Sequence, residues 1–308
     1  MPMGVGVIGL GVMGSPIARH MMASGIEVVG YDIADHAMTA FADVGGKAAA
    51  SPREVAERSE FVLTLLPSVA ALHDVVEGAN GLTQAARGAR VVAECSTLPI
   101  ANKTDARDRL ANFGVDMLDC PLSGTGVQAE ARDLVVFASG PRAAYDKGLP
   151  AFQAMSRAQR FLGDFGNGSR MKFVANHLVN IHNVAAAEAM VLGMKAGLDP
   201  HLIFQVIAES AGSSRMFQVR GRMMADGNYS DVSMALALWR KDIETIAAFA
   251  ADLQCPVPVF TAAAQPYYAA LAQGLGDKDT AAVCAVFEEA ARVVRSPRVV
   301  GRAATEVK

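Results

Sequence analysis

Three closely spaced glycines stand near the start of the chain, inside an apolar stretch. Gly9, Gly11 and Gly14 form the pattern G-x-G-x-x-G in GLGVMG, which follows a strand-like run and opens a helix-like run. Glycine costs conformational entropy in regular structure, so such a cluster indicates a sharp turn or a close approach of the backbone to another group. In this context the first glycine permits the turn, the second admits a pyrophosphate, and the third lets the helix pack on the strand. A glycine-rich turn without a ligand would explain the hexamer alone.

An acidic residue follows the glycines at a spacing typical of ribose recognition. Asp32, in VVGYDIADHA, lies 18 residues beyond Gly14. A carboxylate at the end of a second strand can accept hydrogen bonds from the adenosine ribose hydroxyls, and it repels a 2′-phosphate. No Arg follows directly, so the sequence favours NAD over NADP as the cofactor. A solvated aspartate at a strand end is the alternative, but the two signals together favour a dinucleotide site.

Lys172 and Asn176 are candidates for proton transfer and substrate orientation. In GDFGNGSRMKFVAN (163–176), the glycines and Asn167 indicate the entry to a long helix, with Lys172 near its first turn and Asn176 one turn later on the same face. A helix N-terminus carries partial positive charge, which lowers the pKa of a lysine and favours the neutral amine that a general base requires. From this segment alone, a solvated surface lysine is the simpler interpretation.

A polar loop, DCPLSGTG (119–126), interrupts the apolar strand pattern. A loop at the carboxyl end of a strand lies where ligands bind in open α/β sheets. Ser123 and Thr125 could supply hydroxyls, and the backbone N–H groups of Gly124 and Thr125 could hold a carboxylate. A plain turn explains the same composition, so both interpretations stay open for this segment.

The remaining polar residues give weaker signals. The four cysteines contain no CxxC pair, and the six histidines show no metal-ligand spacing with cysteines or carboxylates, so no metal site is expected. Lys241 and Asp242 in WRKDIET (239–245) are neighbours on an expected helix and, by themselves, predict a surface charge pair. Because no G-K-[ST] follows the glycines, a P-loop is excluded.

The elements that must position these residues alternate in the first half of the chain. Short continuous apolar runs separated by helix-like segments indicate a parallel sheet covered on both faces, which is a doubly wound α/β domain. The expected strands are residues 4–9, 27–32, 61–66, 90–95, 116–121 and 134–139, and expected helical segments include 12–25, 51–59 and 99–114.

After residue 165 the strand pattern stops and helical patterns follow. Residues 169–196 would form a helix of ~42 Å, and further helical stretches are expected at 199–211, 233–252, 257–273 and 277–293. The sequence therefore predicts a dinucleotide-binding domain at 1–165 and an all-α domain at 166–308. A helix of this length often crosses a domain or subunit boundary, which favours a homodimer or homotetramer.

Composition and charge exclude several classes of protein. The 308 residues suit two domains, and 28 basic against 31 acidic residues give a net charge of −3, without a nucleic-acid footprint. No run approaches the ~18 apolar residues of a membrane span. Unpaired cysteines fit a reducing compartment, and the first residues lack a signal-peptide pattern. We therefore expect a cytoplasmic protein with neither nucleic-acid nor membrane partners.

Taken together, the motifs resemble the β-hydroxyacid dehydrogenase family over nearly the whole chain. They are GVIGLGVMGSPIA (6–18), LLPS (65–68), CSTLP (95–99), DCPLSG (119–124), GNGSRMKFVAN (166–176) and LWRKDIE (238–244). The single signals above are weak, and the ordered set reinforces them.

The resemblance implies a Rossmann domain followed by an all-α domain that begins with a long interdomain helix, with the active site in the cleft. It implies NAD-dependent oxidation of a small hydroxy acid, or reduction of its semialdehyde or keto form, with Lys172 as the catalytic acid/base. Ser123, Gly124 and Thr125 would bind substrate, which Asn176 would orient. The implied cofactor-binding residues are Gly9, Leu10, Gly11, Val12, Met13, Gly14, Asp32, Leu66, Pro67, Thr97 and Lys241.

Departures from the family pattern fall partly on the substrate loop. The family usually has S-G-G where this chain has SGT (123–125), a second Asn where it has His177, and G-A-x-x-G-T-L where it has QAEARDL (128–134). These changes leave the identity of the substrate open. The alternatives are an imine-reductase-like enzyme, whose relatives usually carry another residue at the position of Lys172, and a non-catalytic nucleotide-sensing protein, in which loss of that lysine would be expected.

Overall fold

The computed structural model describes residues 4–295, and the chain divides into two compact units. Unit 1 comprises residues 1–178 and 241–256, and unit 2 comprises residues 179–240 and 257–308. Residues 1–3 and 296–308, which belong to the two expected domains, lie outside the described residues. The domain limits expected at 165 and 166 stay a prediction.

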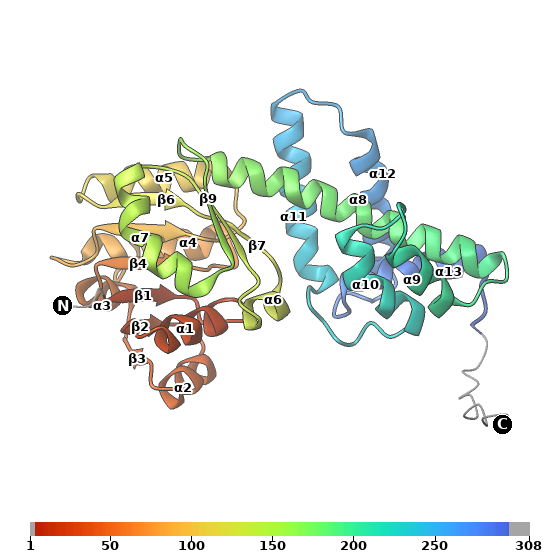
Figure 1. Cartoon of the computed structure of the whole chain (residues 1–308). Coiled ribbons are helices and arrows are strands. Elements are labelled where there is room, and N and C mark those ends of the chain that lie inside the picture. Colours follow the sequence, from red (N-terminus) through yellow and green to blue (C-terminus); the bar gives the residue numbers. More distant parts are fainter. Residues whose placement is uncertain (1–3, 296–308) are drawn as a thin grey trace. The chain divides into compact units, whose positions relative to one another are not determined.

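Unit 1 contains the predicted parallel sheet (Figure 1). Its six strands lie in the order β3-β2-β1-β4-β5-β6, and each neighbouring pair is parallel. The strand order reverses between β1 and β4, and the carboxyl ends at such a switch point are where open α/β sheets bind ligands. The strands are β1 (Val5–Ile8), β2 (Val28–Tyr31), β3 (Lys47–Ala48), β4 (Phe61–Thr64), β5 (Val91–Glu94) and β6 (Asp116–Asp119).

The central strand β1 shows why continuous apolar runs occupy the middle of this sheet. All four of its residues are buried. Val5 and Val7 pack into the core on one face, and Ile8 packs into the core on the other. Because side chains alternate across a strand, burial of both faces requires apolar residues at successive positions.

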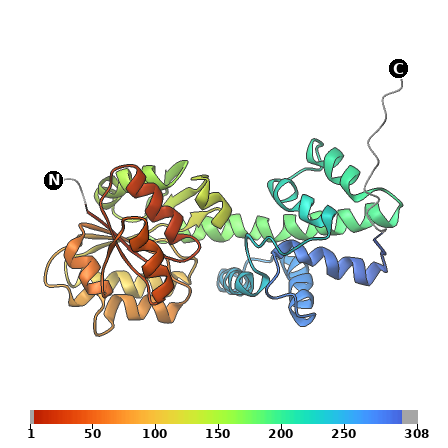
Figure 2. The ribbon, with the colours of Figure 1, turned by 90° about the horizontal axis from the view of Figure 1, so that it is seen from below.

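Helices cover both faces of this sheet, as Figures 1 and 2 show. Ile17 of α1 and Phe152 of α7 belong to the core on one face, and Leu72 of α4 and Leu110 of α5 belong to the core on the other. Together with the strand order, these layers confirm the predicted Rossmann fold. The helices are α1 (Gly14–Ala23), α2 (Asp35–Asp43), α3 (Pro52–Arg58), α4 (Val69–Glu77), α5 (Ile100–Ala111), α6 (Gly126–Glu130) and α7 (Arg142–Met155), with a 3-10 turn, η1 (Leu82–Gln84).

A second, three-stranded sheet extends unit 1. It consists of β7 (Leu122–Ser123), β8 (Val135–Ala138) and β9 (Ala158–Phe161), with β7 antiparallel and β9 parallel to β8. The expected strand at 134–139 thus exists as β8, but it pairs outside the six-stranded sheet. A bridge between Asp119 and Ser139 brings β8 to the end of β6. The polar loop after β6 is therefore folded back along β8.

Every regular element described in unit 2 is helical, as expected. Asp279 ties several of its segments together, since its carboxylate accepts from Arg220 at 3.1 Å and from the Ser233 hydroxyl at 2.7 Å. No helix in the described part of the chain combines the length and the apolar character that crossing a membrane requires. Unit 2 holds α9 (Pro200–Ala208), α10 (Arg215–Asp226), α12 (Pro258–Ala272), η2 (Thr280–Ala282) and α13 (Val283–Ala291), while α8 (Asn167–Lys195) and α11 (Leu236–Asp252) contribute to both units.

Candidate active site

The glycine-rich turn joins β1 to α1, and its three glycines have different surroundings. Gly9 has φ +96°, and a Cβ there would lie 2.1 Å from the Leu65 carbonyl oxygen. A Cβ on Gly14 would lie 1.8 Å from the Gly9 carbonyl oxygen. A Cβ on Gly11, which is exposed, would meet no atom within 4 Å. Backbone packing therefore requires Gly9 and Gly14, whereas Gly11 borders open space that a ligand can approach.

The N-terminus of α1 lies at the end of this turn. Its N-cap residue, Met13, makes no side-chain cap hydrogen bond. Val12 is 75% exposed, while Leu10 is buried. The uncapped helix start offers backbone N–H groups and a positive dipole end to phosphate oxygens. The turn therefore fits the pyrophosphate of a dinucleotide.

Asp32 is fixed beside the same turn. Its Oδ2 accepts a hydrogen bond of 2.7 Å from the Leu10 N–H, and its Oδ1 accepts one of 2.9 Å from the Ala34 N–H. The carboxylate is thus held at the end of β2 by backbone donors on both sides. The glycine-rich turn and Asp32, the two sequence signals for a dinucleotide, therefore lie side by side in the structure.

The ends of β4 and β5 are joined to each other and to α11. The Leu66 N–H donates to the Ser96 hydroxyl at 2.7 Å, and the Lys241 ammonium donates to the Thr97 carbonyl oxygen at 2.8 Å. Pro67 follows Leu66 and is exposed. Leu66 and Pro67 therefore lie at the carboxyl end of β4, which neighbours β1, and Thr97 lies at the carboxyl end of β5, the next strand of the sheet.

Lys172 lies in the second turn of α8 and is only 9% exposed, so the surface interpretation of this residue is wrong. Burial lowers the pKa of Lys172 to about 8, the Asp242 carboxylate opposes this shift, and the Lys241 ammonium adds to it. Desolvation is thus the largest cause of the lowered pKa. Among residues 4–295, the amine makes no hydrogen bond. A poorly hydrated amine with this pKa suits proton transfer.

Asp242 is a site residue that the sequence analysis did not select. It is 7% exposed, so the prediction that its charge pair with Lys241 lies on the surface is wrong for Asp242. Its Oδ2 accepts from the Asn176 amide at 2.9 Å, and its Oδ1 lies 3.5 Å from the Lys241 ammonium. Burial raises the pKa of Asp242, and the neighbouring Lys241 and Lys172 ammonium groups oppose that rise. A buried carboxylate thus contacts Asn176 and Lys241 and acts on Lys172 through its charge.

The predicted substrate loop has less free backbone than the sequence suggested. The Thr125 N–H donates to the Gln128 side-chain oxygen at 2.9 Å, which caps α6. That N–H is therefore not available to a carboxylate, which corrects the expectation for the Thr125 backbone, whereas substrate binding by the Thr125 side chain stays a prediction. Gly124 has φ +140°, and a Cβ there would lie 2.5 Å from Leu134.

Ser123 and Gly126 define the two ends of this loop. Ser123 is half-buried in β7, and no hydrogen bond engages its hydroxyl within the described residues. A Cβ on Gly126 would lie 2.4 Å from a methyl group of Val12. The structure thus brings the predicted substrate loop against the glycine-rich turn. No hydrogen bond joins Ser123 to Lys172 among the described residues.

Three charged side chains at the ends of β5 and β6 were also missed. Lys103 lies 2.6 Å from a Glu94 carboxylate oxygen and 2.8 Å from an Asp119 oxygen, and all three side chains are fully buried. An acidic residue ends each of two apolar strand runs, in RVVAEC and DMLD, and this was the available signal.

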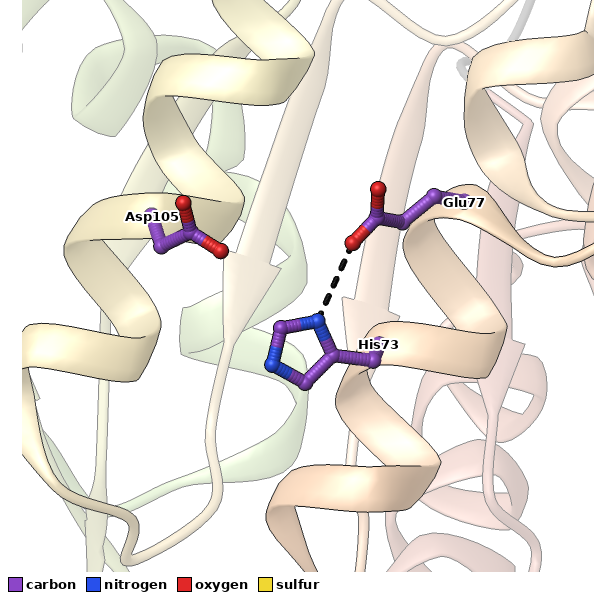
Figure 3. A group of neighbouring side chains, drawn as sticks. All are labelled: His73, Glu77 and Asp105. Atoms are coloured by element: carbon purple, nitrogen blue, oxygen red, sulfur yellow. Dashed lines mark hydrogen bonds and ion pairs between the residues drawn. The ribbon is translucent and has the colours of Figure 1, made fainter.

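One group among the described residues has distances that could suit a metal ion. Ligand atoms of His73, Glu77 and Asp105 lie within 4.8 Å of one another, and Figure 3 shows the 3.0 Å contact from His73 to Glu77. Arg109 forms ion pairs with both Glu77 and Asp105. Because the Arg109 guanidinium already occupies both carboxylates, we assign no metal to this group.

Comparisons with known proteins bear on the whole chain. Residues 4–163 match the family described as the NAD-binding domain of 6-phosphogluconate dehydrogenase, and residues 166–287 match that described as NAD-binding of NADP-dependent 3-hydroxyisobutyrate dehydrogenase. An L-threonate dehydrogenase of Cupriavidus necator is 34% identical over 284 residues, which cover 92% of this chain and 95% of the relative. A 2-(hydroxymethyl)glutarate dehydrogenase of Eubacterium barkeri is 28% identical over 92% of this chain and 95% of its own length.

Similarity to a solved structure agrees with these matches. The crystal structure of 3-hydroxyisobutyrate dehydrogenase from Salmonella typhimurium is 30% identical, with a TM-score of 0.84, and the match covers 92% of this chain and 99% of that chain. Fold, site and relatives define a pyridine-nucleotide-dependent dehydrogenase that acts on hydroxy acids. The chain belongs to the β-hydroxyacid dehydrogenase family, as its ordered motifs predicted.

Proposed function

We propose that the protein transfers hydride between NAD and a small hydroxy acid, or its semialdehyde or keto form, with Lys172 as the general acid/base. The observation that carries this proposal is the buried amine of Lys172, whose pKa of about 8 makes both protonation states accessible near neutral pH. A general acid/base is most effective when its pKa lies near the working pH.

The residues around Lys172 suit proton transfer in both directions. When bound, the dinucleotide supplies the hydride acceptor for oxidation and the hydride donor for reduction. In oxidation neutral Lys172 takes the proton of the substrate hydroxyl, and in reduction protonated Lys172 donates it. Asp242 raises the pKa of Lys172 against the effect of burial, so the ammonium form persists. Asn176, whose amide is held by Asp242, orients the substrate.

The substrate carboxylate is proposed to bind at the 123–126 loop. The Ser123 hydroxyl and the Gly124 backbone are the proposed donors. Thr125 shapes the loop through its hydrogen bond with Gln128. A small carboxylic acid is therefore the favoured substrate class.

NAD is proposed as the cofactor, with NADP less favoured. Asp32 carries a negative charge beside the glycine-rich turn, and a second negative charge follows three residues later at Asp35. No Lys or Arg occurs at positions 33–36 to pair with a 2′-phosphate. The proposed cofactor contacts are Gly9, Leu10, Gly11, Val12, Met13, Gly14, Asp32, Leu66, Pro67, Thr97 and Lys241.

The activity is tested by following NAD reduction at 340 nm with a panel of 3- and 4-hydroxy acids, and the reverse reaction with the matching semialdehydes. Each substrate is also assayed with NADP. We expect turnover of at least one small hydroxy acid with NAD. Reduction of cyclic imines without oxidation of any acid would favour the imine-reductase alternative. Tight NADH binding without turnover of either class would favour a nucleotide-sensing protein.

We also propose a homodimer or homotetramer in the cytoplasm. In α8, Met171, Val174 and Leu178 are exposed apolar side chains at helical spacing. An apolar stripe of this kind supports association with a second copy. Light scattering at micromolar concentration tests the assembly, and a monomeric mass would contradict it.

A further inference from the structure

A fully buried ionic network lies at the start of the helix that carries Lys172. We propose that Asp119 is a positioning residue, which holds the first turn of α8 on the end of β6 and thereby sets the place of the Lys172 amine. Lys103 and Glu94 keep the Asp119 carboxylate in its orientation. This inference rests on the proposed function, since it assigns the geometry of the general acid/base to residues outside the reacting groups.

The network is ionic and excluded from water. The Lys103 ammonium contacts Glu94 at 2.6 Å and Asp119 at 2.8 Å, and donates to the Ser96 carbonyl oxygen at 2.7 Å. Although burial opposes its charge, Asp119 and Glu94 raise the pKa of Lys103, so the ammonium form is maintained. A buried ion pair is a poor source of net stability compared with apolar packing. We therefore assign this network a role in orienting neighbouring groups through directed hydrogen bonds.

Asp119 directs two of these bonds at the first turn of α8. The Ser169 N–H donates to Asp119 Oδ2 at 2.7 Å, and the Ser169 hydroxyl donates to Asp119 Oδ1 at 2.7 Å. The preceding Gly168 N–H donates to the Ser139 hydroxyl at 2.9 Å. Two N–H groups that a helix start leaves without intrahelical partners are thus satisfied. A carboxylate at this end also complements the helix dipole.

The backbone of α8 rests directly on the strands at this point. A Cβ on Gly168 would lie 2.5 Å from the Asp119 carbonyl oxygen and 2.4 Å from that of Phe137. Residues three and four positions apart share a helix face, so Lys172 follows Ser169 and Gly168 on the same side. The contact that anchors the helix is therefore one turn from the proposed catalytic amine.

The other end of the network reaches the predicted cofactor-lining loops. The second Glu94 oxygen accepts from the Ser96 N–H at 2.9 Å, and the Ser96 hydroxyl accepts from the Leu66 N–H at 2.7 Å. One set of buried charges therefore fixes both the α8 turn and the strand end beside the dinucleotide site. Misplacement of reacting groups by ~1 Å can lower the rate by a factor on the order of 10². A network that holds both the α8 turn and this strand end in place should therefore affect the rate of the reaction.

A positioning role for Asp119 predicts a shift in the pKa of Lys172, which a loss of stability alone does not produce. If the first turn of α8 loosens, the Lys172 amine gains water, whereas Asp242 and Lys241, the charged groups that act on it, belong to another helix, α11. Desolvation is the largest cause of its lowered pKa. Loosening the turn must then move that pKa upward, toward the ordinary lysine value.

The test measures the pH dependence of Lys172 acylation directly, in the full chain without substrate. An amine-reactive ester acylates neutral Lys172, and peptide mass spectrometry gives the rate as a function of pH. Ser169→Ala and Asp119→Asn are compared with wild type, with thermal unfolding of each recorded. Ser156→Ala is the matched control, because Ser156 is also buried in unit 1 and donates to the Phe152 carbonyl at 2.6 Å.

We expect Ser169→Ala and Asp119→Asn to raise the labelling midpoint by about one pH unit, and Ser156→Ala to leave it unchanged. If Asp119→Asn does not fold, Ser169→Ala alone decides. A folded Ser169→Ala protein with the wild-type midpoint would overturn the inference. The expected shift in a protein that oxidises no acid would support the positioning role and reject the proposed function, so the two failures are distinguishable.

Discussion

Asn176 in α8 donates a hydrogen bond of 2.9 Å to Asp242 in α11, although the two residues are 66 positions apart in the chain. This bond places a buried carboxylate near the Lys172 amine and fixes the amide that we propose to orient the substrate. The surroundings of the proposed proton-transfer group are therefore assembled by tertiary contact between two helices and not by one local motif.

The first prediction concerns the pH dependence of the wild-type enzyme. Because burial lowers the pKa of Lys172 to about 8, the neutral amine predominates above that pH and the ammonium below it. Oxidation requires the neutral amine, so kcat/KM for the hydroxy acid should rise with pH and level off above about pH 8. Reduction requires the ammonium and should decline over the same range. Steady-state kinetics in both directions from pH 6 to 10 checks this, and parallel profiles for the two directions would contradict it.

The second prediction is that Asp242→Asn shifts both profiles toward lower pH. The Asp242 carboxylate raises the pKa of Lys172. The uncharged amide of the substituted asparagine lacks this effect, so the pKa of Lys172 falls. Reduction at neutral pH should therefore suffer more than oxidation. The matched control is Glu244→Gln, an exposed acidic position two residues further along α11. An unshifted Asp242→Asn profile would remove Asp242 from the electrostatics of the site.

The third prediction separates catalysis from cofactor binding. Lys172→Ala should reduce kcat by a factor on the order of 10² to 10⁴, because the general acid/base is lost. NADH affinity, measured by fluorescence titration, should stay close to that of wild type. Lys147→Ala, an exposed lysine on α7, serves as the control and should retain full turnover. Near-wild-type turnover of Lys172→Ala would falsify its assignment.

The fourth prediction distinguishes the three glycines of the turn. Gly9→Ala and Gly14→Ala should lower Tm markedly, because each new Cβ would lie about 2 Å from a backbone oxygen. Gly11→Ala meets no atom within 4 Å and should leave Tm unchanged. It should nevertheless weaken NADH binding about tenfold, or about 1.4 kcal/mol, by occupying the space beside the pyrophosphate. Equal losses of Tm in all three variants would show that Gly11 is structural as well.

The fifth prediction concerns cofactor choice. Asp32→Ser removes a negative charge beside the proposed ribose site while keeping a hydroxyl near the Leu10 N–H. The ratio of kcat/KM with NADP to that with NAD should rise at least about tenfold, since a 2′-phosphate is no longer repelled. Asp43→Ser, at the other end of α2, should leave the ratio unchanged. An unaltered ratio in Asp32→Ser would place the discrimination elsewhere.

Much of the fold was predictable because its signals are local. The five apolar runs of the main sheet each contain a strand with at least three buried residues, and the G-x-G-x-x-G motif lies between β1 and α1. The elements that escaped prediction lack such patterns. The exposed pair Lys47–Ala48 forms β3, and polar RMFQVRGRMMAD, with an internal glycine, forms α10. Their structure depends on the neighbours against which they pack.

The site was less predictable, because burial of a charged residue is decided by distant parts of the chain. Lys172 and Asp242 look like surface residues in sequence, and tertiary contact between α8 and α11 buries both. The Thr125 N–H looked free, yet Gln128 three residues later engages it. Local composition indicates which groups are present, whereas their protonation and availability follow from packing.

Unit 1 is built from two stretches of sequence, residues 1–178 and 241–256. A nascent chain that has emerged only to residue 240 holds the whole glycine-rich turn and Lys172, but it lacks Asp242 and Lys241. Loop closure over such a span is a slow, late step compared with formation of local helices. During synthesis, nucleotide binding through the glycine-rich turn should therefore precede the ability to turn over substrate, and a ribosome-arrested chain should show this binding without the proposed Lys241 contact.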